Sequence, residues 1–288
     1  PPAVRAGPHT GIAMNLVNGV ESDAISVRDR GLTYGDGVFR TFTLRGGKPL
    51  LWARQYAKLA ADCGVLRITC PAADVLECDL AAVAARCPDC VVRIIITRGA
   101  GERGYAFPAA PSPVRVVSAS PLPDYPQRHY ASGVRVQLCR IRLAAQPALA
   151  GIKHLNRLEN VLARAEWSDP GIAEGLLRDA DDNLIGGTMT NVFAVSRGEL
   201  VTPDLARCGV AGVQRELVIG LARSNDIPVR IANVSIDELL AADELFLVNS
   251  VIGAWQIAEF GGKSWAPGQM TAQVRRWIEQ FQDRDALA

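Results

Sequence analysis

The sequence lacks any long hydrophobic run. Its most apolar segments are the size of a β-strand, such as residues 91–96, and none approaches the roughly 18 apolar residues that a membrane-spanning helix needs. It also lacks a basic excess, since 31 lysines and arginines stand against 30 aspartates and glutamates. A nucleic-acid backbone is bound largely through surplus positive charge. We therefore expect neither a membrane protein nor a nucleic-acid-binding protein.

Residues 1–13 lack the charged stretch followed by an apolar segment that forms a secretory signal peptide. They contain three prolines and no regular hydrophobic period, so we interpret them as an extension or an expression remnant ahead of Met14. We expect the protein to be cytoplasmic.

The seven cysteines do not form a disulfide pattern, because their number is odd and they are widely spaced. Cys87 and Cys90 have the spacing of some zinc and redox sites. A zinc site needs a second pair of ligands at a matching spacing, and the sequence offers none. We expect reduced, mostly buried thiols and no metal site, which agrees with a cytoplasmic protein.

Composition and length indicate a folded protein of about two domains. Hydrophobic residues make up 49% and charged residues 21% of the 288 residues, and a domain typically takes roughly 150 residues. Residues 120–126 contain three prolines, which interrupt strands, so we place a linker there. The predicted divisions are an extension at 1–13, a small domain at 14–120, a linker at 121–133 and a large domain at 134–288.

Hydrophobic periodicity predicts both strands and helices. Strands are expected at 14–19, 38–44, 49–51, 91–97, 114–118, 134–139, 174–178, 191–195 and 244–248, and helices near 56–63, 73–86, 158–165, 212–223 and 269–284. Ser235 and Glu238 have the spacing of a capping box before another short helix. Because strands and helices mix without a strict alternation, we predict an α+β fold with mixed sheets.

The segment AGIKHLNRLEN, residues 150–160, holds the most informative residue of the chain. It places Lys153 just before a predicted helix and after an irregular segment. Partial burial and nearby cations lower the pKa of a lysine, and a neutral amine can form a Schiff base. Most lysines before a helix are solvated surface residues, so this position alone is weak evidence.

Four motifs, in order along the chain, resemble those of the fold-type IV pyridoxal-phosphate enzymes, and most closely the aminodeoxychorismate lyases. They are DRGLTYGDGVF at 29–39, TRGAGERGY at 97–105, the Lys153 segment, and TNVF at 190–193. The resemblance extends from Met14 onward. It implies a small N-terminal α/β domain, a larger mixed-sheet domain that binds pyridoxal 5′-phosphate, and a homodimer.

The resemblance also implies roles for individual residues. Lys153 would carry the cofactor as a Schiff base and act as the general base. Other cofactor contacts would come from Gly212 and Val213 at a helix start, the Ser250 hydroxyl, and Lys58, where the family usually has an arginine. The two substrate carboxylates would be met by Arg98 and Arg103, with Asn249 and Thr41 nearby and with Arg40 beside Thr41.

One position departs strongly from the family. Gly186 stands where the family typically has a glutamate paired with the pyridine nitrogen. Thr188, Thr190 or a water would contact the nitrogen instead, without a charge. A weaker electron sink disfavours transamination more than an elimination that is driven by aromatisation of a ring. We therefore hypothesise that Gly186 favours elimination.

Three interpretations remain open at this point. The first is a lyase that converts 4-amino-4-deoxychorismate to 4-aminobenzoate and pyruvate, in folate synthesis. The second is an aminotransferase of the same fold, acting on D-amino or branched-chain amino acids. The third is a non-catalytic relative, which Gly186 and Lys58 favour and the presence of Lys153 opposes.

Overall fold

The computed structural model describes residues 14–287 and divides the chain into two compact units. The first unit ends at Pro123 and the second begins at Asp124. This junction falls within the segment 121–133 that the prolines mark as a linker. The predicted extension at 1–13 lies outside the described residues.

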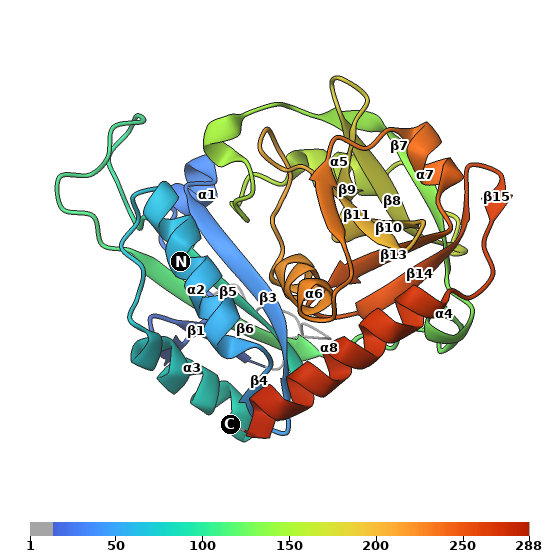
Figure 1. The fold of residues 1–288 in the computed structure, drawn as a ribbon. Coiled ribbons are helices and arrows are strands. Elements are labelled where there is room, and N and C mark those ends of the chain that lie inside the picture. Colours follow the sequence, from blue (N-terminus) through green and yellow to red (C-terminus); the bar gives the residue numbers. More distant parts are fainter. Residues whose placement is uncertain (1–13, 288) are drawn as a thin grey trace. The chain divides into compact units, whose positions relative to one another are not determined.

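The first unit is built on one antiparallel sheet with the strand order β2-β1-β6-β5-β3-β4 (Figure 1). Apolar side chains of the neighbouring strands β3 and β5, among them Phe42, Ile94 and Ile96, are fully buried. Helix α2 packs on β3 through Leu59 and Cys63, which recur at helical spacing. The elements are β1 (Met14–Val17), β2 (Val20–Glu21), α1 (Arg30–Tyr34), β3 (Gly37–Arg45), β4 (Lys48–Pro49), α2 (Trp52–Val65), α3 (Ala73–Arg86), β5 (Cys90–Thr97) and β6 (Val114–Pro121).

The strands β6 and β4 end at other residues than predicted. β6 continues through Pro121, which pairs with Cys90, whereas the predicted strand ended at residue 118. A proline is tolerated at a strand end because few ladder hydrogen bonds depend on its missing N–H there. The predicted strand 49–51 is shorter, because Leu51 turns into the left-handed region at φ 59° and starts α2.

The second unit contains a larger mixed sheet with the order β12-β11-β10-β13-β14-β7-β8-β9, and β15 beside β14 (Figure 1). Three neighbouring pairs are parallel: β14 with β7, β7 with β8, and β11 with β12. This mixture confirms the predicted α+β class. The elements are α4 (Arg128–Ala131), β7 (Val134–Leu143), a 3-10 turn (Pro147–Leu149), α5 (Leu158–Arg164), β8 (Ile172–Asp179), β9 (Leu184–Gly187), β10 (Asn191–Ser196), β11 (Glu199–Pro203), α6 (Val213–Ser224), β12 (Val229–Ala232), α7 (Ile236–Ala241), β13 (Glu244–Asn249), β14 (Gly253–Phe260), β15 (Lys263–Ser264) and α8 (Gln269–Leu287).

Local patterns account for several of these elements. The Ser235 side chain accepts from the Glu238 N–H at 3.1 Å and starts α7, as the capping spacing predicts. The apolar residues of α5 behave differently. Leu158, Val161 and Leu162 lie at helical spacing, yet they are 69%, 61% and 51% exposed in this chain. The helix instead packs through Ala163, which is fully buried.

Among residues 14–287, no helix is both long and apolar enough to cross a membrane.

Candidate active site

Lys153 lies in an irregular segment between the 3-10 turn and α5, and it is half-buried. Two residues before it, Gly151 forms an isolated parallel bridge with Val210. The Gly151 N–H donates to Gly209 O at 3.0 Å, and the Ala211 N–H donates to Gly151 O at 3.1 Å. These bonds join the lysine segment to the residues directly before α6. Residues 151 and 210 are far apart in the sequence, so this contact exists only in the folded chain.

The segment that carries Lys153 is also held by Arg157, which follows it in the sequence. Arg157 folds back and donates from Nε to His154 O at 2.9 Å and from NH2 to Ile152 O at 3.2 Å. The carbonyls on both sides of Lys153 are thus occupied by one guanidinium. This restricts the backbone that carries the lysine.

Gly212 is the N-cap of α6, and Asn191 of β10 holds it in place. Asn191 Oδ1 accepts from the Gly212 N–H at 3.2 Å, and its Nδ2 donates to Val210 O at 2.8 Å. A Cβ at position 212 would lie 2.4 Å from Asn191 Oδ1, so this turn requires a glycine. The first N–H groups of a helix have no partner within it, and together with the helix dipole they attract anions.

Gln214, in the first turn of α6, is 1% exposed, and both polar atoms of its side-chain amide lack a partner among the described residues. Buried amides are normally hydrogen-bonded, so such an orphan next to free helix N–H groups suits a bound polar group. An anionic group such as a phosphate fits this end of the helix.

The turn between β9 and β10 surrounds a carboxylate that the sequence analysis did not single out. Glu174 of β8 is completely buried, and the hydroxyls of Thr188 and Thr190 both donate to it. These are the hydroxyls expected near a pyridine nitrogen. Burial raises the pKa of Glu174 above its ordinary value, and the hydrogen bonds from the turn oppose that rise.

A signal for Glu174 is present in the sequence, since it is the one charged residue within the otherwise apolar segment 172–177. Its partners could not be deduced, because they come from the following hairpin and turn rather than from its own strand.

The described part of the chain matches a known family. The model of the amino-transferase class IV family matches residues 37–260. The chain belongs to the amino-transferase class IV family.

Members of this family with a solved or curated record resemble the chain over most of its length. A 4-amino-4-deoxychorismate lyase from Pseudomonas aeruginosa has 46% sequence identity and a TM-score of 0.89, with 93% of this chain and 98% of that one covered. An aminodeoxychorismate lyase from Vibrio harveyi is 34% identical over 83% of this chain and 89% of its own length. A branched-chain aminotransferase from Thermoproteus uzoniensis shares the fold, with a TM-score of 0.82 at 21% identity over 94% of each chain.

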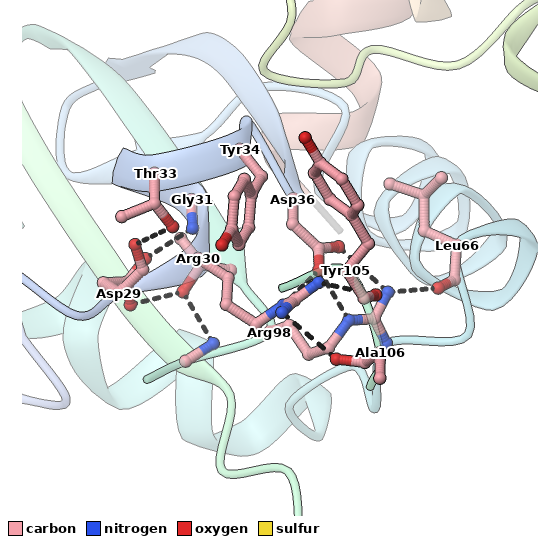
Figure 2. A network of polar contacts seen from close by, with 12 residues as sticks. Asp29, Arg30, Gly31, Thr33, Tyr34, Asp36, Leu66, Arg98, Tyr105 and Ala106 are labelled. Carbon is pink, nitrogen blue, oxygen red and sulfur yellow. Dashed lines mark hydrogen bonds and ion pairs between the residues drawn. The ribbon is translucent and has the colours of Figure 1, made fainter. Parts of the chain in front are cut away.

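In this class IV chain, the first unit holds a network of buried charges (Figure 2). Arg98 donates from Nε and NH2 to Asp36 and also to the carbonyls of Leu66 and Arg67. Its guanidinium lies 3.7 Å from the centre of the Phe107 ring. Arg98 is 2% exposed, so a contact with substrate, which stays a prediction, would require some of these bonds to be exchanged.

Arg30 lies on the other side of Asp36 and holds the glycine-rich loop. Its Nε donates to Asp36 Oδ2 at 2.9 Å, and its terminal nitrogens donate to the carbonyls of residues 104, 105 and 106 (Figure 2). Arg103 is exposed on this loop. Arg30 therefore fixes the backbone of the loop, while the Arg103 side chain on the same loop is exposed to solvent.

The predicted phosphate cation, Lys58, forms an ion pair with Asp62 one turn further along α2. Asp62 also pairs with the buried Arg40 of β3. Burial lowers the pKa of the Arg40 guanidinium, and the charge of Asp62 opposes that shift. The Asp62 carboxylate is thus shared by these two cations. The half-buried Thr41 follows Arg40 on β3.

Asn249 and Ser250 end β13 in the second unit. Asn249 Oδ1 accepts from the N–H groups of Val251 and Ile252 at 2.8 and 2.9 Å, and its Nδ2 donates to Met189 O at 3.3 Å. Ser250 is half-buried in the following turn. Asn249 thus connects the end of β13 to the turn that holds Glu174.

Proposed function

We propose that this class IV chain is a pyridoxal-phosphate-dependent lyase that converts 4-amino-4-deoxychorismate to 4-aminobenzoate and pyruvate, a step in folate synthesis. The observation that carries the proposal is the backbone bridge between Gly151 and Val210, which places the Lys153 segment against the start of α6. A lysine and an anion site in one place are what this cofactor requires. Relatives named as this lyase match most of the chain.

The residues of the second unit fit the cofactor. Lys153 would hold it covalently, and the Val213 N–H and the Ser250 hydroxyl would hold its phosphate, while Gly212, whose N–H is bonded to Asn191, would shape the turn before them. Thr188 and Thr190 would lie near its ring nitrogen, and Lys58 is proposed as a further cation for its phosphate. When bound, the cofactor withdraws electrons from the substrate carbon that bears the amino group.

Lys153 performs the proton transfers in the proposed reaction. Its free amine removes the ring proton from the carbon that bears the amino group, as a general base. The carbon–oxygen bond to the enolpyruvyl group breaks, and the ring becomes aromatic. The Lys153 ammonium returns the proton to the methylene carbon of the departing enol, which gives pyruvate. A lysine suits both steps because its amine accepts a proton and its ammonium returns it.

The substrate carries two carboxylates, and Arg98 and Arg103 are the proposed cations. Arg103 is exposed on the loop that Arg30 fixes, so its guanidinium can reach a ligand without breaking a structural bond. Arg98 would act from the buried network that it forms with Asp36. Asn249 and Thr41 are proposed as polar neighbours of the substrate.

An aminotransferase is the second candidate. A putative branched-chain-amino-acid aminotransferase from Methanocaldococcus jannaschii is 28% identical over 91% of this chain, which favours it. Gly186 opposes it, because the ring nitrogen then lacks a directly adjacent carboxylate.

We also propose a cytoplasmic homodimer. All seven cysteines are free thiols, as in proteins of a reducing compartment. The exposed apolar side chains of α5, Leu158, Val161 and Leu162, supply a surface that a second copy would cover.

A product assay tests the function. The purified protein with pyridoxal phosphate is given 4-amino-4-deoxychorismate, and separately amino donors with keto acids. We expect equal amounts of 4-aminobenzoate and pyruvate, no product from Lys153→Ala, and unchanged activity in Lys48→Ala, which alters an exposed lysine of β4. Amino-group exchange without 4-aminobenzoate would make the chain an aminotransferase. No product and no cofactor absorbance would support a non-catalytic relative.

A further inference from the structure

The carboxylate of Glu174 is enclosed by the chain. Glu174 lies on β8 between β7 and β9 and is 0% exposed. Desolvating a charge is costly, so a carboxylate persists at such a position only where hydrogen bonds replace its water.

Five groups donate to this carboxylate. Oε1 accepts from the N–H groups of Gly175 at 2.9 Å and Thr188 at 3.1 Å and from the Thr188 hydroxyl. Oε2 accepts from the Met189 N–H at 3.1 Å and from the Thr190 hydroxyl at 3.0 Å. Three of the five are backbone N–H groups, which can only donate. The arrangement therefore suits the ionised form, which can only accept.

The neighbouring glycine makes room for these contacts. A Cβ at Gly187 would lie 2.2 Å from Thr190 Oγ1 and 2.7 Å from Glu174 Oε2. Any other residue at 187 would push the hydroxyl and the carboxylate apart. The short link from Glu174 to Thr190 thus depends on the absence of a side chain at 187.

The turn around Glu174 is hydrogen-bonded to the elements that flank the proposed lysine and anion site. Asn160 of α5 donates to Thr188 O at 2.9 Å, which ties the turn to the helix that follows Lys153. Asn191, directly after Thr190, holds the start of α6. Glu174 is thus hydrogen-bonded to a turn that contacts α5 on one side and, through the next residue, the start of α6 on the other.

A hydroxyl that gives its proton to a carboxylate has only lone pairs left for a further partner. Thr188 and Thr190 therefore face any ligand as acceptors, with a negative charge behind them. Such a surface selects a ligand atom that carries a proton, above all a protonated heteroaromatic nitrogen. Burial is the main cause of the raised pKa values of Tyr125 and Cys139, and the charge of Glu174 adds to both.

We propose that Glu174 is a positioning residue that makes the Thr188–Thr190 turn an acceptor for the protonated ring nitrogen of the bound cofactor, its charge acting through the two threonine hydroxyls. This rests on the proposed function, because it requires that pyridoxal phosphate binds. It explains how a site with glycines at 186 and 187 keeps a negative charge near that nitrogen.

The test measures the protonation of the ring nitrogen directly. The protein is loaded with pyridoxal phosphate labelled with ¹⁵N in the ring, and the ¹⁵N chemical shift is followed against pH. We expect Glu174→Gln to lower the pKa of the bound ring nitrogen by ~1 unit or more, at least about a tenfold change in its protonation equilibrium. Glu166→Gln is the matched control, since Glu166 also accepts from two backbone N–H groups, of Arg140 and Ile141. We expect it to leave the ring nitrogen unchanged.

A double variant separates the charge from the fold of the turn. Thr188→Val/Thr190→Val keeps Glu174 and its three N–H donors but removes both hydroxyls, and we expect it to reproduce the shift seen with Glu174→Gln. An unchanged ring nitrogen in both variants would overturn the role of Glu174. A shift with Glu174→Gln alone would overturn the relay through the threonines. Failure of the unaltered protein to bind pyridoxal phosphate would instead overturn the proposed function, and this role with it.

Discussion

Asp36 and Arg98 form a two-point ion pair inside the first unit. Arg98 Nε lies 2.8 Å from Asp36 Oδ2, and its NH2 nitrogen lies 2.9 Å from Oδ1. The same Oδ2 also accepts from Arg30 Nε. One carboxylate therefore orders two arginines whose remaining N–H groups hold the end of α2 and the glycine-rich loop (Figure 2).

We expect Asp36→Asn to destabilise the protein strongly, by about 3 kcal/mol or more, because it leaves two buried guanidinium groups without their counter-charge. Equilibrium unfolding in urea measures this loss. Glu102→Gln is the control, since Glu102 is 94% exposed in its pair with Arg28 and should change stability by less than about 1 kcal/mol. Equal effects of the two substitutions would contradict the role of Asp36.

The same carboxylate should contribute to acid unfolding. Burial alone would raise the pKa of Asp36, but hydrogen bonds and charges from Arg98 and Arg30 hold it below its ordinary value of 3.8. A carboxyl with a lowered pKa in the folded state stabilises the protein above its ordinary pKa and loses that effect as pH falls through the lowered one. Asp36→Asn should therefore flatten the acid limb of stability against pH, measured by urea unfolding at a series of pH values. An identical acid limb in the variant would refute this.

Gly99→Ala should destabilise the glycine-rich loop by more than about 2 kcal/mol. Gly99 has a φ of 85°, and a Cβ there would lie 1.8 Å from Ser112 O, so both backbone strain and a clash result. Gly64→Ala is the matched control, because Gly64 lies in α2 with open space around its Cβ position. This substitution should raise the free energy of unfolding by about 0.5–1 kcal/mol. Thermal unfolding of both variants decides the point. A neutral Gly99→Ala would show that the loop adopts another conformation.

Gly186→Glu should give the protein amino-transfer activity. A Cβ at 186 would lie 2.9 Å from Thr190 O, so the backbone must shift by a few tenths of an ångström. A directly placed carboxylate would strengthen the electron sink that transamination needs. Amino exchange between alanine and 2-oxoglutarate measures the effect, with Gly186→Ala as the uncharged control. Complete absence of amino transfer in Gly186→Glu would remove the support for an elimination-adapted site.

Asn191→Ala should weaken binding of pyridoxal phosphate about tenfold, because it frees Val210 O and the Gly212 N–H and loosens the start of α6. Binding of pyridoxal, which lacks the phosphate, should change much less. Fluorescence titration with the two ligands measures both affinities. Asn225→Ala, at the exposed opposite end of α6, is the control. Equal weakening for both ligands would contradict a phosphate site at this helix.

Local pattern predicted the elements whose signal lies within a few residues. Helix α3 covers 73–86 as expected, because apolar residues recur there at helical spacing. The apolar run at 91–96 forms the central strand β5, which has a strand on each side and buries the face that carries Val92, Ile94 and Ile96. Strand β14 was not predicted, although it joins the two halves of the larger sheet. Its pairing with β7 is parallel and distant in sequence, and no turn signal announces it.

The apolar side chains of α5 show the limit of the same reasoning. Leu158, Val161 and Leu162 have the spacing of a buried face, but they are exposed in the single chain. Periodicity shows that a face is apolar and does not reveal what covers it.

The sequence by itself determined the family, because short motifs around Lys153 and at residues 29–39, 97–105 and 190–193 occur in a characteristic order, and it singled out Lys153 as the proposed cofactor lysine. Only the tertiary structure decided where the charges lie. Arg98 pairs with Asp36 across 62 positions, and Glu174 meets its hydroxyl partners 14 and 16 positions away. The physical reason is that a buried charge is defined by the donors and acceptors that replace its water, and strand pairing brings these together from distant parts of the chain.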